Sequence, residues 1–333
     1  EPLSSVVRRK LAWLALGLGA ALLAAVGVLA VRRAPTPGAQ ELAFAETPAA
    51  PGGDANESLP RDKPLPEPVA AAPSAPSAPA GMLRVPGGSF TMGADRGGQA
   101  DERPAHAVSL ASFWLDATEV TNAAYQRCVD AGVCRAPDPT SSAVYHLPDA
   151  KFRGPQQPVN EVSFDDARAY CAFVGKRLPS EAEWERAARG DDERRFPWGN
   201  APITPEHAVY ESQFTSEVGR HPAGNGPYGH ADLIGNVWEW VEDEYDPYAY
   251  RRASAALGKP GSCKEILNAL DELRRSGQQG FTGSNPLPSE CEHVLRGAGF
   301  NYQAKHIRIT NRVHHPGRMR LVMAGFRCAL DAR

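Results

Sequence analysis

The strongest hydrophobic feature of the chain is an uncharged apolar run over residues 11–31, LAWLALGLGAALLAAVGVLAV. At about 1.5 Å per residue, a helix of this length crosses the hydrocarbon core of a bilayer. Basic residues flank the run on both sides, with a slight excess before it, which favours a cytoplasmic N-terminus. We therefore predict a transmembrane helix over residues 11–31 and a cytoplasmic juxtamembrane stub over residues 1–10; a cleaved signal peptide is the alternative.

Residues 32–82 have no apolar period and are rich in proline and alanine, as in EPVAAAPSAPSAPAG. Such a segment cannot bury enough apolar surface to offset the loss of chain entropy, so we expect a semi-extended linker. The remaining residues, 83–333, are enough for one globular domain with a sizeable core.

Short alternating stretches within that domain predict strands. MLRVPGGSFTMGA alternates apolar and small residues around a Pro-Gly-Gly turn and predicts a β-hairpin, and AHAVSLASFWLDATEV is a second alternating stretch. Beyond residue 190, short segments with many turns follow one another. The pattern indicates an α+β domain with little regular secondary structure.

Two helices are predicted within VSFDDARAYCAFVGKRLPSEAEWERAARG. Ser163 with Asp166, and Ser180 with Glu183, have the spacing of capping boxes that start a helix. A glycine follows each apolar-periodic segment and marks its end.

Residues 262–276, SCKEILNALDELRRS, predict a further helix, because Ser262 and Glu265 repeat the capping pattern and the apolar residues fall on one face. Cys263 and Cys291 could fasten this segment to the domain. The helix then either covers a cleft as a lid, meets a partner helix, or packs on its own domain.

The formal net charge is −3, and no basic stripe lies outside the flanks of the apolar run. A nucleic-acid-binding protein would carry such a stripe, so we expect no nucleic acid among the partners. The apolar run instead makes the membrane a predicted partner, through a single-pass anchor.

All six cysteines lie in the globular part, and none has the CxxC spacing of a zinc site. One arrangement that the spacing allows pairs Cys128 with Cys134, Cys263 with Cys291 and, as the remainder, Cys171 with Cys328. Disulfides need an oxidising compartment, so this interpretation places the domain outside the cytoplasm. Buried free thiols are the alternative.

Six motifs occur in the order found in the formylglycine-generating enzyme (sulfatase-modifying factor) family: VPGGSFTMGA, EVTNAAYQRC, PVNEVSFDDARAYCAFVGKRLPSEAEWERAARG, FPWGN, GNVWEW and AGFRC. The chain resembles this family over roughly residues 83–330. The resemblance implies the family's fold, a variant of the C-type lectin architecture with low secondary-structure content. It also supports the pairing of Cys171 with Cys328.

The resemblance further implies an activity that converts a cysteine of a substrate protein to formylglycine, with oxygen and a copper ion held by two cysteines. Soft thiolates select Cu(I) over harder metals. In RGAGFNYQAKHIR, the two cysteine positions hold Tyr302 and Ile307, and no cysteine lies between Cys291 and Cys328. We therefore expect no copper and no formylglycine-generating activity.

The segment DLIGNVWE is a candidate calcium site. Asp232 and Glu239 offer carboxylate oxygens, and a turn could direct the main-chain carbonyls of Gly235 and Val237 at the same point. The matching positions in the family bind structural calcium, with asparagine usual where Asp232 stands. The alternative is that the tryptophans pack in the core and Glu239 meets an arginine.

The resemblance also implies a groove, because the strand that carries Tyr302, His306, Arg308 and Asn311 faces the substrate cleft in the family. Aromatic and hydrogen-bonding side chains suit recognition of a peptide or a sugar. A half-exposed strand without a ligand is the alternative. The histidines lack the spacing of an iron site built from two histidines and a carboxylate.

These observations predict a membrane-tethered, extracytoplasmic domain of the sulfatase-modifying-factor type that binds or senses a ligand without oxidase chemistry. We expect it on the periplasmic side of a bacterial cytoplasmic membrane, with a peptide, a glycan or an envelope protein as ligand. One alternative is a metal-dependent oxidoreductase of the formylglycine-generating type that acts on a protein cysteine. The other is an envelope maturation factor.

Overall fold

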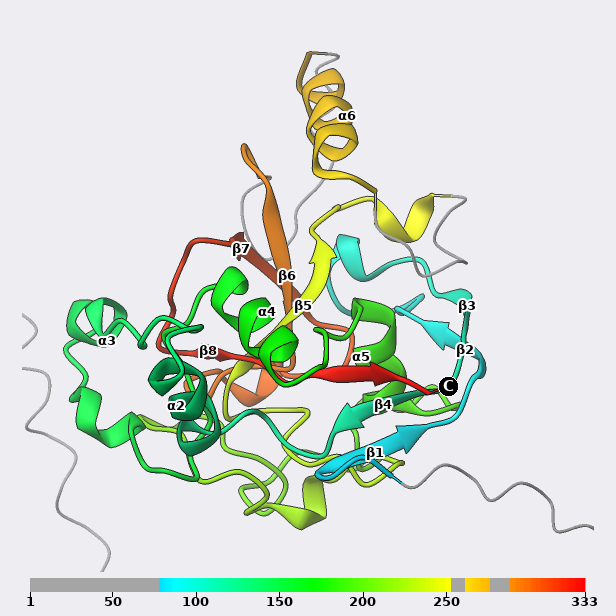
Figure 1. Cartoon of the computed structure of the whole chain (residues 1–333). Helices are drawn as coiled ribbons and strands as arrows, with labels where there is room; N and C mark the ends of the chain where they lie inside the picture. Colours follow the sequence, from blue (N-terminus) through cyan, green and yellow to red (C-terminus); the bar gives the residue numbers. More distant parts are fainter. Residues whose placement is uncertain (1–77, 253–260, 276–287, 333) are drawn as a thin grey trace, which may run out of the picture. The chain divides into compact units, whose positions relative to one another are not determined.

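The computed structural model describes residues 78–252, 261–275 and 288–332 (Figure 1). The predicted transmembrane helix over residues 11–31 and nearly all of the predicted linker lie outside this part. Among the described residues, no helix has both the length and the apolar character needed to cross a bilayer. The described part is a mixed α/β fold in which long loops connect short elements.

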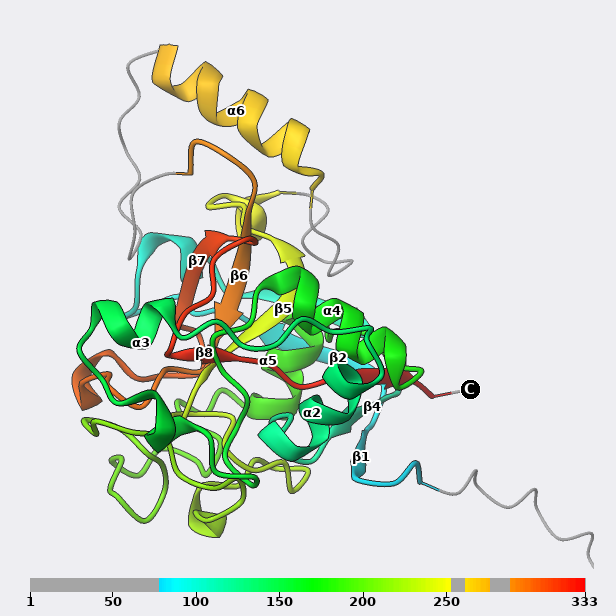
Figure 2. The same ribbon diagram turned by 60° about the vertical axis from the view of Figure 1, so that its left-hand side comes forward.

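A four-stranded sheet lies at the centre of the fold (Figures 1 and 2). Its strands, in spatial order, are β7 (Arg312–Pro316), β6 (Glu292–Arg296), β5 (Trp238–Glu244) and β8 (Ala324–Gly325). The β6 strand pairs antiparallel with both of its neighbours, whereas β5 and β8 are parallel. Residues from far apart in the sequence therefore meet along β6.

Two smaller sheets complete the β-structure. The first has the order β1 (Met82–Val85), β4 (Phe113–Asp116) and β9 (Ala329–Asp331), and the second pairs β2 (Gly88–Met92) with β3 (His106–Leu110). The hairpin predicted within MLRVPGGSFTMGA is therefore wrong, since its two halves belong to different sheets. Gly87 passes so close to the main chain that a Cβ there would lie 2.7 Å from the nitrogen of Ser112, so the turn crosses between sheets.

The two helices predicted from capping boxes are present, as α4 (Phe164–Phe173) and α5 (Glu181–Arg189). At the start of α4, the Asp166 N–H donates to Ser163 Oγ at 3.2 Å and the Ser163 N–H donates to Asp166 Oδ2 at 3.0 Å. Every residue of α5 is buried, because the helix contacts β2 on one side and β5 and β6 on another.

The other helical segments are short, apart from α6. They are α2 (Asn122–Asp130), α3 (Thr140–Val144), α6 (Cys263–Arg275) and the 3₁₀ turns η1 (Ala100–Glu102), η2 (Asp149–Phe152), η3 (Pro222–Gly224), η4 (Ala249–Arg251) and η6 (Ala304–His306). The α6 helix is the one predicted from the sequence of residues 262–276. It stands clear of the sheets in both views (Figures 1 and 2).

All six cysteines form disulfides, and the pairs are those that the spacing allows: Cys128–Cys134, Cys171–Cys328 and Cys263–Cys291. The Cys171–Cys328 bridge ties α4 to the residue that precedes β9, in the main hydrophobic core. It closes a loop with a sequence separation of 157 residues, whereas Cys128–Cys134 spans a separation of 6.

We expect the double substitution Cys171→Ala/Cys328→Ala to lower the free energy of unfolding by about 5 kcal/mol, because a disulfide restricts the unfolded chain more as its loop grows. Cys128→Ala/Cys134→Ala is the matched control, since these sulfurs are also buried, and the same model gives a loss of about 2 kcal/mol. Urea unfolding followed by tryptophan fluorescence measures both. Equal losses in the two variants would contradict the loop-length argument.

Candidate functional site

A cavity of about 420 Å³ lies beside the turn η6. We call it the groove, and its lining is Gln99, Asn301, Tyr302, Gln303, His306, Arg308 and Asn311. All four residues predicted from the resemblance are among them. The structure thus brings together Tyr302, His306, Arg308 and Asn311 around one hollow.

Packing and hydrogen bonds fix the shape of the groove. The half-buried ring of Tyr302 packs edge-on against Trp238, with 4.9 Å between ring centroids, and burial raises the pKa of its hydroxyl. Asn311 Nδ2 donates to the main-chain oxygen of His306 at 3.0 Å, which closes the η6 turn. Arg308 is tied to the buried carboxylate of Glu102, with its Nε 2.8 Å from Oε2.

Ile307, which the resemblance aligns with the second cysteine position of the family, lies elsewhere. Ile307 has an exposed fraction of 0% and belongs to the main hydrophobic core, so its side chain does not line the groove. Tyr302, at the first position, is the only one of the pair that does. The two positions therefore present a phenol to the groove and an aliphatic side chain to the core.

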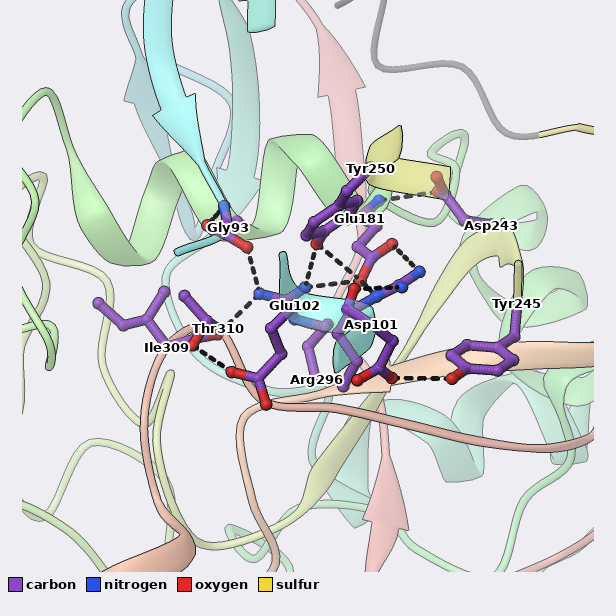
Figure 3. Close-up of polar contacts among 12 residues, drawn as sticks. Gly93, Asp101, Glu102, Glu181, Asp243, Tyr245, Tyr250, Arg296, Ile309 and Thr310 are labelled. Atoms are coloured by element: carbon purple, nitrogen blue, oxygen red, sulfur yellow. Dashed lines mark hydrogen bonds and ion pairs between the residues drawn. The ribbon is translucent and has the colours of Figure 1, made fainter. Parts of the chain in front are cut away.

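A buried ion network holds α5 to the central sheet (Figure 3). Arg296 of β6 has an exposed fraction of 0%, and its guanidinium lies 2.6 Å from Glu181 Oε1 and 2.5 Å from Glu185 Oε2. Arg312 of β7 donates to both oxygens of Glu181, at 2.7 and 2.9 Å. Two carboxylates of α5 thus neutralise two arginines of the central sheet.

Further buried carboxylate contacts reach Gly93 and Thr310, which line a second cavity described below. Glu185 Oε1 accepts the N–H of Gly93 at 2.8 Å, and Thr310 donates its hydroxyl to Glu102 Oε2 at 2.6 Å. Burial acts to raise the pKa of Glu102, but the hydrogen bonds and charge of Arg308 outweigh it and lower the pKa overall. The close-up shows Thr310 directed at the Glu102 carboxylate, with Gly93 close by (Figure 3). Sequence reasoning missed this network; Glu181 and Glu185, one helical turn apart, were its visible signal.

Asp243 is a buried carboxyl at the edge of this network. Its Oδ2 accepts the N–H of Glu181 at 2.7 Å. Burial, followed by the negative charge of Glu181, raises the pKa of Asp243 to about 8. The positive charge of Arg312 acts to lower this pKa, whereas the negative charge of Glu183 acts to raise it. Asp243 therefore carries a proton in the folded protein at neutral pH.

The predicted calcium ligands Asp232, Gly235, Val237 and Glu239 lie on the loop that leads into β5 and on β5 itself. Glu239 has both carboxylate oxygens 2.7 Å from the guanidinium of Arg327, and Oε2 also accepts the indole N–H of Trp184 at 2.9 Å. This arrangement matches the alternative interpretation of Glu239. A cation ligand with both oxygens committed to an arginine does not fit a calcium site well.

Asp232 has a different environment. Its Oδ2 accepts the N–H of Gly219 at 2.5 Å, and burial raises its pKa. The neighbouring Glu119 is also buried, and burial followed by the charge of Asp232 raises its pKa well above the usual range. Glu119 Oε2 has no hydrogen-bond partner among the described residues. A cation would fit this pair better than it fits Glu239, and the calcium ion stays a prediction.

The histidines of the C-terminal part do not converge. His314 pairs with Glu292 and stacks on Tyr245, whereas His293 stacks on Phe164. Over residues 78–252, 261–275 and 288–332, no group of three or more His, Cys, Asp or Glu side chains is arranged to hold a metal ion.

Comparison with known proteins identifies the family. The model of the sulfatase-modifying factor enzyme 1-like domain matches residues 68–332, and the chain belongs to this family. It is similar to the formylglycine-generating enzyme of Streptomyces coelicolor, with 37% identity over 56% of this chain and 77% of that protein. It is also similar to the hercynine oxygenase of Mycolicibacterium smegmatis, with 34% identity over 49% of this chain but only 46% of that protein.

A third relative is the inactive Cα-formylglycine-generating enzyme 2 of Bos taurus, 33% identical over 49% of this chain and 71% of that protein. Among solved structures, PvdO from Pseudomonas aeruginosa matches with a TM-score of 0.54 and 25% identity, over 75% of this chain and 94% of that chain. The family therefore includes both active and inactive members, and membership alone does not settle activity.

The protonated state of Asp243 gives a prediction about pH. Between the usual pKa of an aspartate and about 8, the folded protein holds a proton that the unfolded chain releases. The free energy of unfolding therefore falls as the pH rises through this range. Asp243→Asn mimics the protonated form and retains an acceptor for the Glu181 N–H. We expect the variant to become more stable relative to the native protein, by on the order of a few kcal/mol, as the pH rises from 5 to 8.

Denaturant unfolding at several pH values measures this difference. Asp165→Asn is the control, because Asp165 is an exposed carboxylate on α4 whose pairing with Arg168 lies at the surface. A stability difference that does not change with pH would contradict a protonated Asp243.

Proposed function

We propose that this chain is a non-catalytic binding module of the sulfatase-modifying-factor family, and that the groove is its ligand-binding surface. One observation carries the proposal. At the positions of the family's two copper-binding cysteines, Tyr302 lines the groove and Ile307 is enclosed in the core. Every cysteine of the chain is also engaged in a disulfide, so no thiolate is left to bind Cu(I).

The groove itself suits binding. Its lining combines an aromatic ring, amides, an imidazole and a guanidinium, which are groups that recognise polar ligands through stacking and directed hydrogen bonds. Asn311 and Arg308 are fixed by contacts to η6 and Glu102, so little side-chain entropy is lost when a ligand binds. A ligand would meet a surface that is already arranged.

We propose a peptide segment of an envelope protein as the ligand. The formylglycine-generating activity implied by the resemblance acts on a cysteine within a protein chain, so a peptide-binding module would keep the ligand class of the formylglycine-generating relatives without their chemistry. The three disulfides support an oxidising, extracytoplasmic location, and the apolar run over residues 11–31 supports a membrane tether. The periplasm of a bacterium would provide both.

The proposal predicts the metal content and the oxygen chemistry of the protein. We expect elemental analysis of protein purified without chelators to find no copper or iron at stoichiometric level, with calcium the one metal retained. We also expect that oxygen uptake in the presence of Cu(I) and a cysteine-containing peptide stays at the level of a blank without protein. One equivalent of copper or iron, together with conversion of the peptide cysteine to formylglycine, would overturn the non-catalytic assignment.

The groove predicts a second result. Peptides selected from a random displayed library on the immobilised full chain should bind Tyr302→Ala at least about tenfold more weakly, because the ring is the largest apolar surface of the groove. Tyr145→Ala is the matched control, since Tyr145 is an exposed tyrosine that lines neither the groove nor the larger cavity described below. Calorimetry measures both affinities. Equal affinity for native protein and Tyr302→Ala, or no selected peptide at all, would contradict a peptide-binding groove.

A further inference from the structure

A second, larger cavity adjoins the groove. Its volume is about 580 Å³, and Arg308 lines both hollows. One wall runs from Thr91, near the end of β2, to Gly98 in the loop that follows, and another is formed by residues 193–195, which follow α5. We call this hollow the arginine cavity, for the composition of its lining.

The lining of the arginine cavity is strongly cationic. Its basic side chains are Arg96, Arg189, Arg194, Arg195, Lys305 and Arg308. Only two carboxylates, those of Asp95 and Glu193, oppose them. Asp95 is partly engaged, because its Oδ1 accepts the N–H of Ala105 at 3.0 Å.

Three of the cations are already neutralised by neighbours outside the lining. Arg194 lies 2.6 Å from Asp192, and Arg189 lies 2.9 Å from Glu185. Arg308 is paired with Glu102, as described above.

The other three cations have no such neighbour. In the part of the chain that the structure describes, no acidic side chain lies within ion-pair distance of Arg96, Arg195 or Lys305. These three come from three separate segments, and each is exposed at the rim of the same hollow. An excess of positive charge converging from separate segments attracts an anion.

Arg189 is the buried cation of this lining. Arg189 has an exposed fraction of 3%, and its Nε finds no acceptor among the described residues, although the Nη2 group bonds to Glu185 and to the oxygen of Gly93. An unpaired buried N–H is costly. Its Nε is shielded from solvent and does not itself contact a bound anion, but the Arg189 guanidinium adds positive charge beside the cavity that it lines.

The loop that carries Gly97 and Gly98 lies close to the Glu102 carboxylate. Gly97 and Gly98 have φ values of +71° and +62°, and a Cβ on Gly98 would collide with the Glu102 carboxylate. The loop therefore passes directly over Glu102, which holds Arg308 between the two hollows. Arg308 lines both hollows, so a ligand that reaches from one hollow to the other would pass this side chain.

We propose that the arginine cavity binds an oxyanion, either a carboxylate or a tetrahedral phosphate or sulfate group, carried by the peptide whose adjacent part occupies the groove. The identity of the peptide rests on the proposed function; the anion site rests on the cavity itself. Guanidinium groups bind both kinds of oxyanion through paired, charge-assisted hydrogen bonds. The ligand class is thus an acidic, phosphorylated or sulfated peptide.

The first experiment uses simple anions on the full chain. Inorganic phosphate, sulfate and succinate are titrated separately, with sodium chloride at matched ionic strength as the blank, and binding is followed by calorimetry. We expect saturable binding of at least one of the three that weakens as salt rises. A preference for succinate indicates a carboxylate ligand, and a preference for phosphate or sulfate indicates a modified one. No saturable binding of any of the three would overturn the anion site.

The second experiment locates the site. Arg195→Gln/Lys305→Gln removes two exposed cations of the cavity, and we expect anion affinity to fall about tenfold. Arg84→Gln/Arg168→Gln is the control, because it changes the net charge equally at exposed arginines that line neither hollow. Equal affinity in the two double variants would mean that the anion binds elsewhere and would overturn the assignment.

The two proposals fail in different ways. If the anion affinity depends on Arg195 and Lys305 but no peptide binds the groove, the anion site stands and the peptide-binding function falls. If selected peptides depend on Tyr302 but are neither enriched in acidic residues nor weakened by the cavity variant, the function stands and the anion site falls.

Discussion

Arg296 and Arg312 are two buried arginines of the central sheet, and two glutamates of the helix α5 form ion pairs with them. The packing of α5 on the sheet depends on these ion pairs. A buried charge is tolerated only when a partner of opposite sign compensates it, and removing one partner of such a pair costs about 3–5 kcal/mol. Glu181 and Glu185 lie on α5, which contacts the β2–β3 hairpin as well as the sheet. The same carboxylates therefore fix three elements relative to one another: α5, the central sheet and the loop that follows β2.

The network also explains why the groove and the arginine cavity are found side by side. Glu185 holds both Gly93 and Arg189, while Glu102 holds Thr310 and Arg308. The carboxylates of Glu185 and Glu102 thus connect the segment between β2 and β3 to residues that line the cavities. Irregular backbone is held in place by these contacts, as a regular element is by its own hydrogen bonds. This is how a domain with little secondary structure can present a defined surface.

Local signals in the sequence identified the helices, since a capping box lies within one turn and its partners are neighbours in the chain. They failed for the strands around Pro-Gly-Gly, because the choice of strand partner depends on residues such as Trp114 and Val108 far along the chain. The groove was reached through family resemblance. The disulfide pairs were one arrangement that the spacing allows, and the resemblance supported the pairing of Cys171 with Cys328. The ion-pair partners of Arg296 and Glu239 lie more than 80 residues away in sequence, so no local pattern reveals them.

The burial of Ile307 is an obstacle to placing a sulfur ligand at this position. A thiol at that position would replace a larger side chain inside a close-packed core, leaving a void and a sulfur surrounded by hydrocarbon. Its thiolate would be disfavoured in that apolar setting, and a metal ion would lack a route to it. A sulfur ligand at position 307 would therefore require the η6 turn to be rebuilt, not a single exchange of residues.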